Sequence, residues 1–133
     1  MTDAAGTPDD TIEPNRDDED GRRLALLAAR TADDRKASDV VVLDVGAVLT
    51  ITGFFVIASA SNTRLVASVA EEIERVVKEE SGRAPVRTEG MREKQWALID
   101  YGDVVVHVFL QETRDFYEIE RLYGDVPKLD WTQ

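Results

Sequence analysis

Two aspartates and one histidine lie close together in this sequence, and their side chains could do chemistry. Asp100 and Asp103 flank Tyr101-Gly102, and a facing pair of carboxylates could bind a divalent cation or share a proton. At the tip of a hairpin, however, such a pair more often stays solvated and helps to shape the turn. His107 is the single histidine of the chain. It lies in the middle of an extended run, where a hydrogen-bonded structural role is more common than a catalytic one.

The short motifs that usually accompany catalysis are absent from the sequence. There is no Gly-x-Gly-x-x-Gly, no phosphate loop ending in Gly-Lys-Ser/Thr, and no His-Glu-x-x-His. A lone histidine does not supply the two or three histidine ligands that catalytic zinc commonly takes. Because the chain has no cysteine, disulfides and thiolate metal sites are excluded. These residues favour a domain that binds a partner over one that catalyses a reaction.

The stretch that must position these side chains runs from residue 96 to residue 110, and its pattern predicts a β-hairpin. Tyr101-Gly102 separates two runs rich in valine and isoleucine, and a glycine in a two-residue link supplies the positive φ that hairpin turns require. With these two residues as the loop, Asp100 would face Asp103. A register shift by one residue would exchange the two faces of the hairpin.

Alternation of side chains along the hairpin predicts two different faces. The apolar face, expected to lie against the core, consists of Ala97, Ile99, Val104, Val106 and Val108. The other face, called the mixed face below, consists of Trp96, Leu98, Asp100, Asp103, Val105 and His107. This composition is typical of a sheet surface that meets a covering helix or a protein partner. Trp96 follows a charged loop, which indicates a rim position, although a tryptophan at the start of a strand more often belongs to the core.

The remaining pattern predicts three helices and three further strands. Helical periodicity covers Gly21 to about Ala37, Ser61 to Gly82, and Thr113 to Tyr123. In the last helix, Thr113 would be the N-cap, Arg114 would pair with Glu118, and one face would hold Phe116, Ile119, Leu122 and Tyr123. Strands are expected at 39–45, 54–59 and 84–89, while 48–52 fits either a strand or a loop. The predicted fold class is α/β, a single layered domain with a mixed sheet of about five strands flanked by helices.

The charge of the chain is concentrated at its start. The 133 residues carry a net charge of -11, of which residues 1–20 contribute -7 and the rest -4. Residues 1–20 are predicted to be a disordered acidic tail, residues 21–124 the domain, and residues 125–133 a C-terminal tail. This charge argues against binding DNA or other nucleic acid through a broad basic surface and favours basic proteins as partners. No segment has the pattern of a membrane span or a signal peptide, so a cytoplasmic location is expected.

Several segments of the chain resemble one known family. They are Asp39 to Asp44, Phe55 to Ser59, Ser61 to Arg64, Glu89-Gly90, Trp96 to Phe109, and Arg114 to Tyr123. Trp-x-Leu-Ile-Asp-Tyr-Gly-Asp-Val-Val-Val-His-Val-Phe followed by Arg-x-Phe-Tyr-x-x-Glu is the most specific part. Across residues 22–124 the chain resembles the ribosomal silencing factor family (RsfS, Iojap-like or DUF143). It departs from the family pattern at Gly53, where an acid is usual, and at Tyr123, where a tryptophan is usual.

The resemblance implies a fold similar to nucleotidyltransferases without their catalytic signature, and therefore no enzyme activity, cofactor or metal. Family members bind ribosomal protein fourteen of the large ribosomal subunit, at the face that contacts the small subunit. Bound there, they block subunit joining and repress translation when nutrients are limiting; related proteins assist assembly of the organellar large subunit. Some members self-associate, so the resemblance also allows a homodimer.

The resemblance places partner binding on the mixed face of the hairpin. The residues expected to contact the partner are Trp96, Leu98, Asp100, Asp103 and Val105, with Tyr101 and Lys94 at the rim. Two rival interpretations stay open. One is a nucleotidyltransferase-like enzyme that uses Asp100 and Asp103 with Mg²⁺, and the other is a nucleotide-binding regulator.

Overall fold

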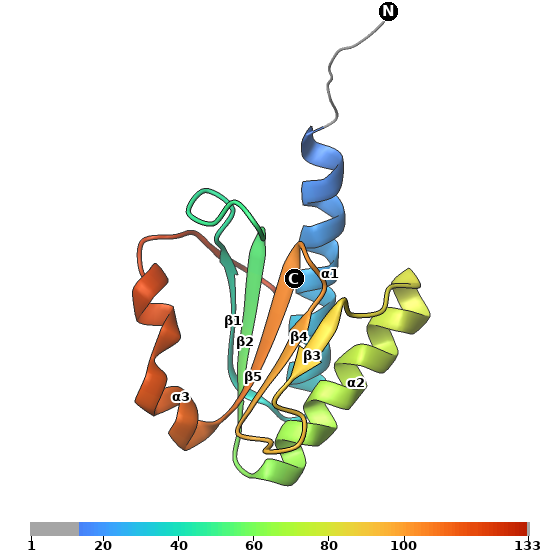
Figure 1. Ribbon diagram of the computed structural model, residues 1–133. Coiled ribbons are helices and arrows are strands. Elements are labelled where there is room, and N and C mark those ends of the chain that lie inside the picture. The colour runs from blue at the N-terminus through green and yellow to red at the C-terminus, as the bar shows by residue number, and fades with distance from the viewer. Residues whose placement is uncertain (1–13, 133) are drawn as a thin grey trace, which may run out of the picture.

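The computed structural model describes residues 14–132 (Figure 1). Its helices are α1 (Pro14–Asp34), α2 (Thr63–Ser81) and α3 (Gln111–Tyr117), with a 3-10 helix, η2 (Ile119–Tyr123). Its strands are β1 (Ser38–Asp44), β2 (Phe54–Ala60), β3 (Arg87–Glu89), β4 (Trp96–Asp100), β5 (Val104–Leu110) and β6 (Lys128–Leu129).

These six strands form one mixed sheet in the order β3-β4-β5-β2-β1-β6. Strands β2 and β5 are parallel, and the other neighbouring strands are antiparallel. Every residue of β2 is buried, as expected for a central strand that carries side chains into both faces. The predicted α/β domain with a mixed sheet is therefore confirmed, with six strands where about five were expected.

The two faces of the sheet are covered to different extents. Helices α1 and α2 lie on one side and α3 on the other (Figure 1). The larger core lies on the α1 and α2 side and includes the whole predicted apolar face of the hairpin. The smaller core, on the α3 side, is built from Leu43, Val45, Phe55, Ile57 and Phe109. Partly buried residues of η2 and the C-terminal segment pack against this smaller core, among them Ile119, Tyr123 and Val126.

Helix α2 agrees with its sequence signals at both ends. Asn62 is the N-cap, and its side-chain oxygen accepts a hydrogen bond from the Leu65 backbone N–H at 2.8 Å. Gly82 ends the helix with a φ of 74°, a left-handed conformation that glycine adopts without steric cost. Local residue chemistry thus sets the bounds of this helix.

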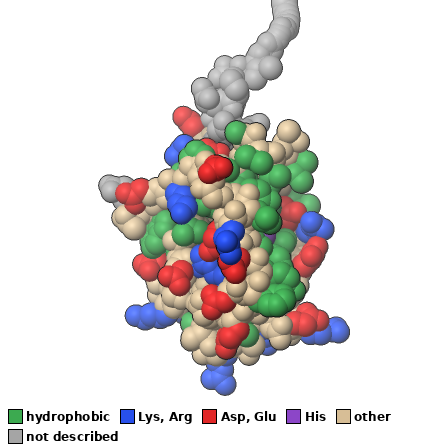
Figure 2. Space-filling view, turned by 90° about the vertical axis from the view of Figure 1, so that its left-hand side faces the viewer, with side chains coloured by type: hydrophobic (Ala, Val, Ile, Leu, Met, Phe, Trp, Pro, Cys, Tyr) green, Lys and Arg blue, Asp and Glu red, His purple; other side chains and the backbone are tan. Residues whose placement is uncertain are grey.

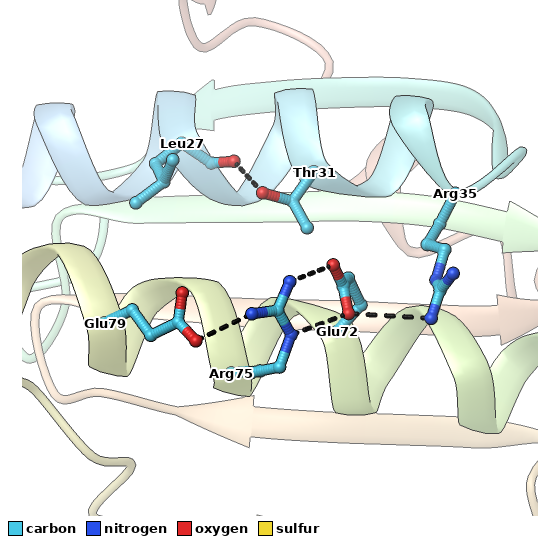
Figure 3. A network of polar contacts seen from close by, with 6 residues as sticks. All are labelled: Leu27, Thr31, Arg35, Glu72, Arg75 and Glu79. Carbon is cyan, nitrogen blue, oxygen red and sulfur yellow. Dashed lines mark hydrogen bonds and ion pairs between the residues drawn. The ribbon is translucent and has the colours of Figure 1, made fainter.

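Helices α1 and α2 approach each other closely and are joined by charged side chains. Alanines at positions 25, 28, 29 and 32 of α1 are fully buried, and their small side chains allow the close approach. Arg35, directly after α1, contacts Glu72 of α2 at 3.5 Å, and Arg75 binds Glu72 at 2.6 Å and Glu79 at 2.7 Å (Figure 3). Hydrogen bonding from Arg75 lowers the pKa of Glu72. Because the two arginines and Glu79 are exposed and only Glu72 is partly buried, the alanine packing contributes more to stability than the ion pairs do.

Both ends of the domain extend further than the sequence pattern predicted. Helix α1 begins at Pro14, so the prediction that residues 14–20 are disordered is wrong, whereas residues 1–13 lie outside the described part. Proline at the first helical position followed by acidic residue types is a favourable helix start. At the other end, β6 pairs with β1, and the Trp131 indole N–H donates to the Val40 carbonyl at 2.9 Å. The segment predicted as a C-terminal tail therefore forms the sixth strand.

Two further predictions of local structure need correction. Strand β3 is confined to Arg87–Glu89, shorter than the expected 84–89, and 48–52 contains no strand. None of the helices within residues 14–132 combines the length and the apolar character that crossing a bilayer demands.

Candidate protein-binding surface

The hairpin of β4 and β5 forms with a register shifted by two residues from the predicted one. Leu98 pairs with His107 and Asp100 with Val105, because the loop residues are Gly102 and Asp103. Gly102 has a φ of 93° at the first loop position, where a type II′ turn requires glycine. The Asp100 carboxylate strengthens this turn by accepting the Gly102 backbone N–H at 2.8 Å. The prediction that Asp100 faces Asp103 is therefore wrong.

A shift by two residues leaves the two faces of the hairpin intact, because side chains alternate with a period of two. The apolar face is buried beneath α1 and α2 as predicted. On the mixed face, Trp96, Leu98, Asp100 and Val105 are partly exposed, and His107 is buried. These four side chains thus keep the outward direction that the sequence predicts, and their contact with a partner stays a prediction.

Two of the residues predicted to bind a partner lie elsewhere. Tyr101 is only 3% exposed and belongs to the larger core, so the prediction that it stands at the rim is wrong. Asp103 is a loop residue of the turn and does not lie on the mixed face. One of its carboxylate oxygens binds Arg83 at 2.7 Å, and the other lies 3.2 Å from the position that a Cβ atom would take at Gly21 in α1. The register explains both placements, because it moves these residues to the helix-covered side.

The two aspartates do not converge on a common site. Asp100 binds the Arg87 Nε at 3.1 Å, while Asp103 is held by Arg83 through hydrogen bonds of 2.7 and 3.2 Å. Within the described part of the chain, no group of three or more His, Asp or Glu side chains could hold a metal ion. Each aspartate therefore stabilises the hairpin through its own arginine. The two carboxylates do not face a common position, which the enzyme interpretation with Mg²⁺ would require.

Trp96 and His107 are bonded to each other across the hairpin. The Trp96 indole N–H donates to His107 Nδ1 at 3.1 Å. Burial lowers the pKa of His107 to about 4, although the nearby Asp100 carboxylate opposes that shift. His107 is therefore neutral at physiological pH and hydrogen-bonded, in agreement with the structural role that its position in the strand predicts.

The loop before β4 holds Trp96 in place through a close backbone approach. Gly90 has a φ of 77°, and a Cβ atom added there would lie 1.9 Å from the Trp96 carbonyl oxygen. Only glycine fits so near another backbone. Lys94 in the same loop is exposed and has a φ of 61°. Its place at the rim of the partner-binding surface stays a prediction.

Helix α3 adds two exposed aromatic residues, Phe116 and Tyr117, of which the sequence interpretation placed Phe116 on one face with Ile119, Leu122 and Tyr123. Phe116 is 78% exposed, and the Tyr117 ring lies 5.0 Å from both the Phe116 and the Trp96 rings. The helix ends at Glu118, whose φ of 50° turns the chain into η2. That turn directs Ile119 toward the core and leaves Phe116 outside.

The start of α3 also differs from the prediction. The N-cap is Leu110 and not Thr113, and no side chain caps the helix. Arg114 pairs with Glu120 and not with Glu118, and Leu122 is 77% exposed. Because residue 118 is a glutamate, the sequence carries no glycine signal for the break. The one sequence signal for an exposed apolar surface on α3 was the pair of adjacent aromatic residues, Phe116-Tyr117.

Together these residues form one continuous surface, called the open face below. It comprises Trp96, Leu98, Asp100 and Val105 of the hairpin with Phe116 and Tyr117 of α3. Seen from the α3 side, hydrophobic side chains gather in a band with charged groups around it (Figure 2). An exposed apolar surface with a charged border is typical of protein interaction sites.

Comparison with known proteins places this chain in a family context. The family described as "Ribosomal silencing factor during starvation" matches residues 18–133. The ribosomal silencing factor RsfS of Halalkalibacterium halodurans is 38% identical over 109 residues, covering 82% of this chain and 92% of the relative. The mouse protein named mitochondrial assembly of ribosomal large subunit protein 1 is 33% identical over 89 residues, covering 65% of this chain and 39% of its own. A crystal structure of a Chromobacterium violaceum protein matches with a TM-score of 0.75 at 32% identity, over 84% of this chain and 92% of that one.

Proposed function

This chain belongs to the ribosomal silencing factor family, and on that premise we propose that it binds the large ribosomal subunit and prevents the small subunit from joining. Its docking partner is ribosomal protein fourteen, on the large-subunit face that meets the small subunit. The bound protein is a physical obstacle there, so the mechanism is steric and needs no reaction. It acts in the cytoplasm and lowers translation when nutrients are limiting.

The open face is the observation that supports this proposal. Trp96 provides an aromatic anchor, and the exposed rings of Phe116 and Tyr117 extend the apolar area beside it. Aromatic side chains dominate the binding free energy of many interfaces, provided that a polar border keeps water away. Asp100, Arg87 and Lys94 supply charged groups at this border.

The net charge of the chain agrees with a basic partner surface. A protein with a net charge of -11 is attracted over long distances to a basic protein, which speeds encounter at low salt. The ion pair between Asp100 and Arg87 involves an arginine side chain that is 60% exposed. A cationic side chain of the partner could therefore compete with Arg87 for the Asp100 carboxylate.

Sedimentation with ribosomes tests the proposal directly. In a sucrose gradient of ribosomes and separated subunits, we expect the protein in the free large-subunit fraction and not in the fraction of joined ribosomes. Addition of excess protein before the gradient should lower the joined fraction. Equal occupancy of both fractions would contradict steric blocking, and absence from both would contradict subunit binding.

A further inference from the structure

His107 is a buried ionisable side chain that the proposed function does not yet use. It is 5% exposed and lies beneath Trp96, which donates its indole N–H to the His107 Nδ1 atom. The other ring nitrogen, Nε2, is buried and has no hydrogen-bond partner among the residues that the structure describes. The imidazole therefore makes a single directed bond, and that bond goes to the anchor of the open face.

The chemistry of the two rings determines which way this bond runs. An indole N–H can only donate a hydrogen bond, so His107 Nδ1 must accept and its proton must reside on Nε2. The Nε2–H is then the buried group without a partner, which is unfavourable. A purely apolar residue would avoid that cost. The arrangement points to a role for the acceptor that goes beyond filling space.

Two aromatic rings pack against the imidazole, one edge-on and one nearly parallel to it. The Phe55 ring meets it edge-on with centroids 4.8 Å apart, and the Phe109 ring is nearly parallel to it at 6.1 Å. Trp96 in turn lies over Phe109 at 4.6 Å and beside Tyr117 at 5.0 Å. Ring contacts of this kind tolerate sliding, whereas a hydrogen bond is directional. The bond to Nδ1 therefore selects one orientation of the indole.

We propose that His107 is a positioning residue, whose Nδ1 atom holds the Trp96 indole in the orientation that receives the ribosomal partner. The inference rests on the proposed function and deepens it. A tryptophan whose rotamer is set before encounter loses less conformational entropy on binding, so preorganisation raises affinity without adding a contact. His107 itself is buried and does not touch the partner.

Two substitutions of similar size separate positioning from space filling. His107→Asn keeps an acceptor at the Nδ1 position, whereas His107→Leu removes it. If His107 only fills space, Leu, which buries no unpaired amide, should be the more stable variant and the better binder. If His107 positions Trp96, Leu should be the more stable variant and the weaker binder. We expect His107→Leu to bind purified ribosomal protein fourteen about three- to tenfold more weakly than wild type, and His107→Asn to bind within about twofold of wild type.

A second measurement needs no partner and covers the case in which the asparagine variant does not fold. In the Trp131→Phe background the remaining indole belongs to Trp96, and its N–H proton can be followed by NMR. When residue 107 is histidine, we expect the Trp96 indole proton to give a downfield, slowly exchanging signal. In His107→Leu, and in His107→Phe, which keeps an aromatic ring at this position, the signal should shift and exchange faster. An unchanged indole signal in these variants would overturn the proposal. Wild-type affinity in His107→Leu would also overturn it.

The proposed function and the positioning role of His107 can be tested separately. If the wild-type protein does not bind the ribosomal protein or the large subunit, the proposed function is wrong, and the indole signal still decides whether His107 orients Trp96. A double-mutant cycle completes the test. In the Trp96→Phe background, His107→Leu should cause no further loss of affinity, and an additional loss equal to that in the wild-type background would contradict positioning through the indole.

Discussion

Arg114 of α3, which is buried, and Glu120 of η2, which is partly buried, form an ion pair that joins the C-terminal segments to the sheet. The Arg114 Nε and NH2 groups donate to the same Glu120 oxygen at 3.0 and 2.8 Å. Its NH1 group donates to the Asp39 carbonyl and to the Ser59 hydroxyl, both at 2.7 Å. Burial is the largest influence on Glu120 and would raise its pKa. The hydrogen bonds from Arg114 and from the backbone, together with the positive charges of Arg114 and Lys128, outweigh burial and leave that pKa lowered. The pair thus locks α3, with Phe116 and Tyr117, against strands β1 and β2.

Removal of Arg114 should therefore be costly. In Arg114→Met we expect the free energy of unfolding to fall by about 3 to 5 kcal/mol, because Glu120, the Asp39 carbonyl and the Ser59 hydroxyl lose their partner. Arg121→Met is the matched control: that side chain is 78% exposed and binds Glu118 at 2.7 Å, so its loss should cost less than about 1 kcal/mol. Denaturant unfolding measures both, and equal costs would show that the pair of Arg114 and Glu120 has no special role.

Truncation of Trp96 should affect binding more than folding. As an interface anchor, Trp96→Ala should lose about 2 to 4 kcal/mol of binding free energy, roughly thirty- to a thousandfold in affinity. The side chain is partly exposed, so the loss of folding stability should stay below the 3 to 5 kcal/mol that is roughly typical of core tryptophans. A binding titration beside a thermal melt separates the two effects.

The second tryptophan provides the control for that experiment. Trp131 also donates its indole N–H to a protein acceptor, but it follows β6, at the edge of the sheet opposite β3 and β4. We expect Trp131→Ala to lower the melting temperature while the folded protein keeps its affinity. If Trp96→Ala binds normally, the interface lies elsewhere and α3 is the next surface to substitute.

Gly90 should tolerate no side chain. In Gly90→Ala the positive φ and the contact with the Trp96 carbonyl oxygen should together cost about 2 to 5 kcal/mol. Gly82→Ala is the control, because Gly82 has a similar φ of 74° and nothing within 4 Å of the added Cβ. That variant should cost about 1 to 2 kcal/mol. Equal losses in thermal or denaturant unfolding would mean that the loop before β4 moves aside easily.

The buried histidine should make stability depend on pH. Burial lowers the pKa of folded His107 to about 4 from its ordinary value of 6.5, so the unfolded chain takes up the proton first as the pH falls. Above about pH 6.5 the histidine is neutral in both states and causes no loss of stability. Between pH 6.5 and pH 4 its protonation in the unfolded chain lowers the free energy of unfolding, by about 3 kcal/mol in total. Urea unfolding across this pH range measures the effect. We expect the free energy of unfolding to fall more steeply in wild type than in His107→Phe, and the difference belongs to the histidine because both proteins have the same carboxylates. Parallel pH profiles would contradict the prediction.

Local residue patterns were sufficient to predict the elements whose causes lie within a few residues. The caps of α2, Asn62 and Gly82, and the alternation that buries Ala97 and Ile99 beneath the helices are of this kind. The two faces of the hairpin survived an error in the register, because a shift by two residues preserves side-chain direction. The family resemblance likewise came from the sequence, since residues such as Trp96 and His107 stand in a specific order.

The tertiary structure decided the features that depend on contacts between distant segments. The strand at 128–129 exists because it pairs with β1, and the break at Glu118 leaves Phe116 exposed because Arg114 reaches Glu120 and the sheet. The bond between Trp96 and His107 arises from the two-residue loop Gly102-Asp103, which places Leu98 opposite His107. Sequence alone determined that a tryptophan and a histidine share one face of a hairpin. Only the folded chain decided that they bond to each other, because turn geometry and the packing of the Phe55 and Phe109 rings set where each side chain can reach.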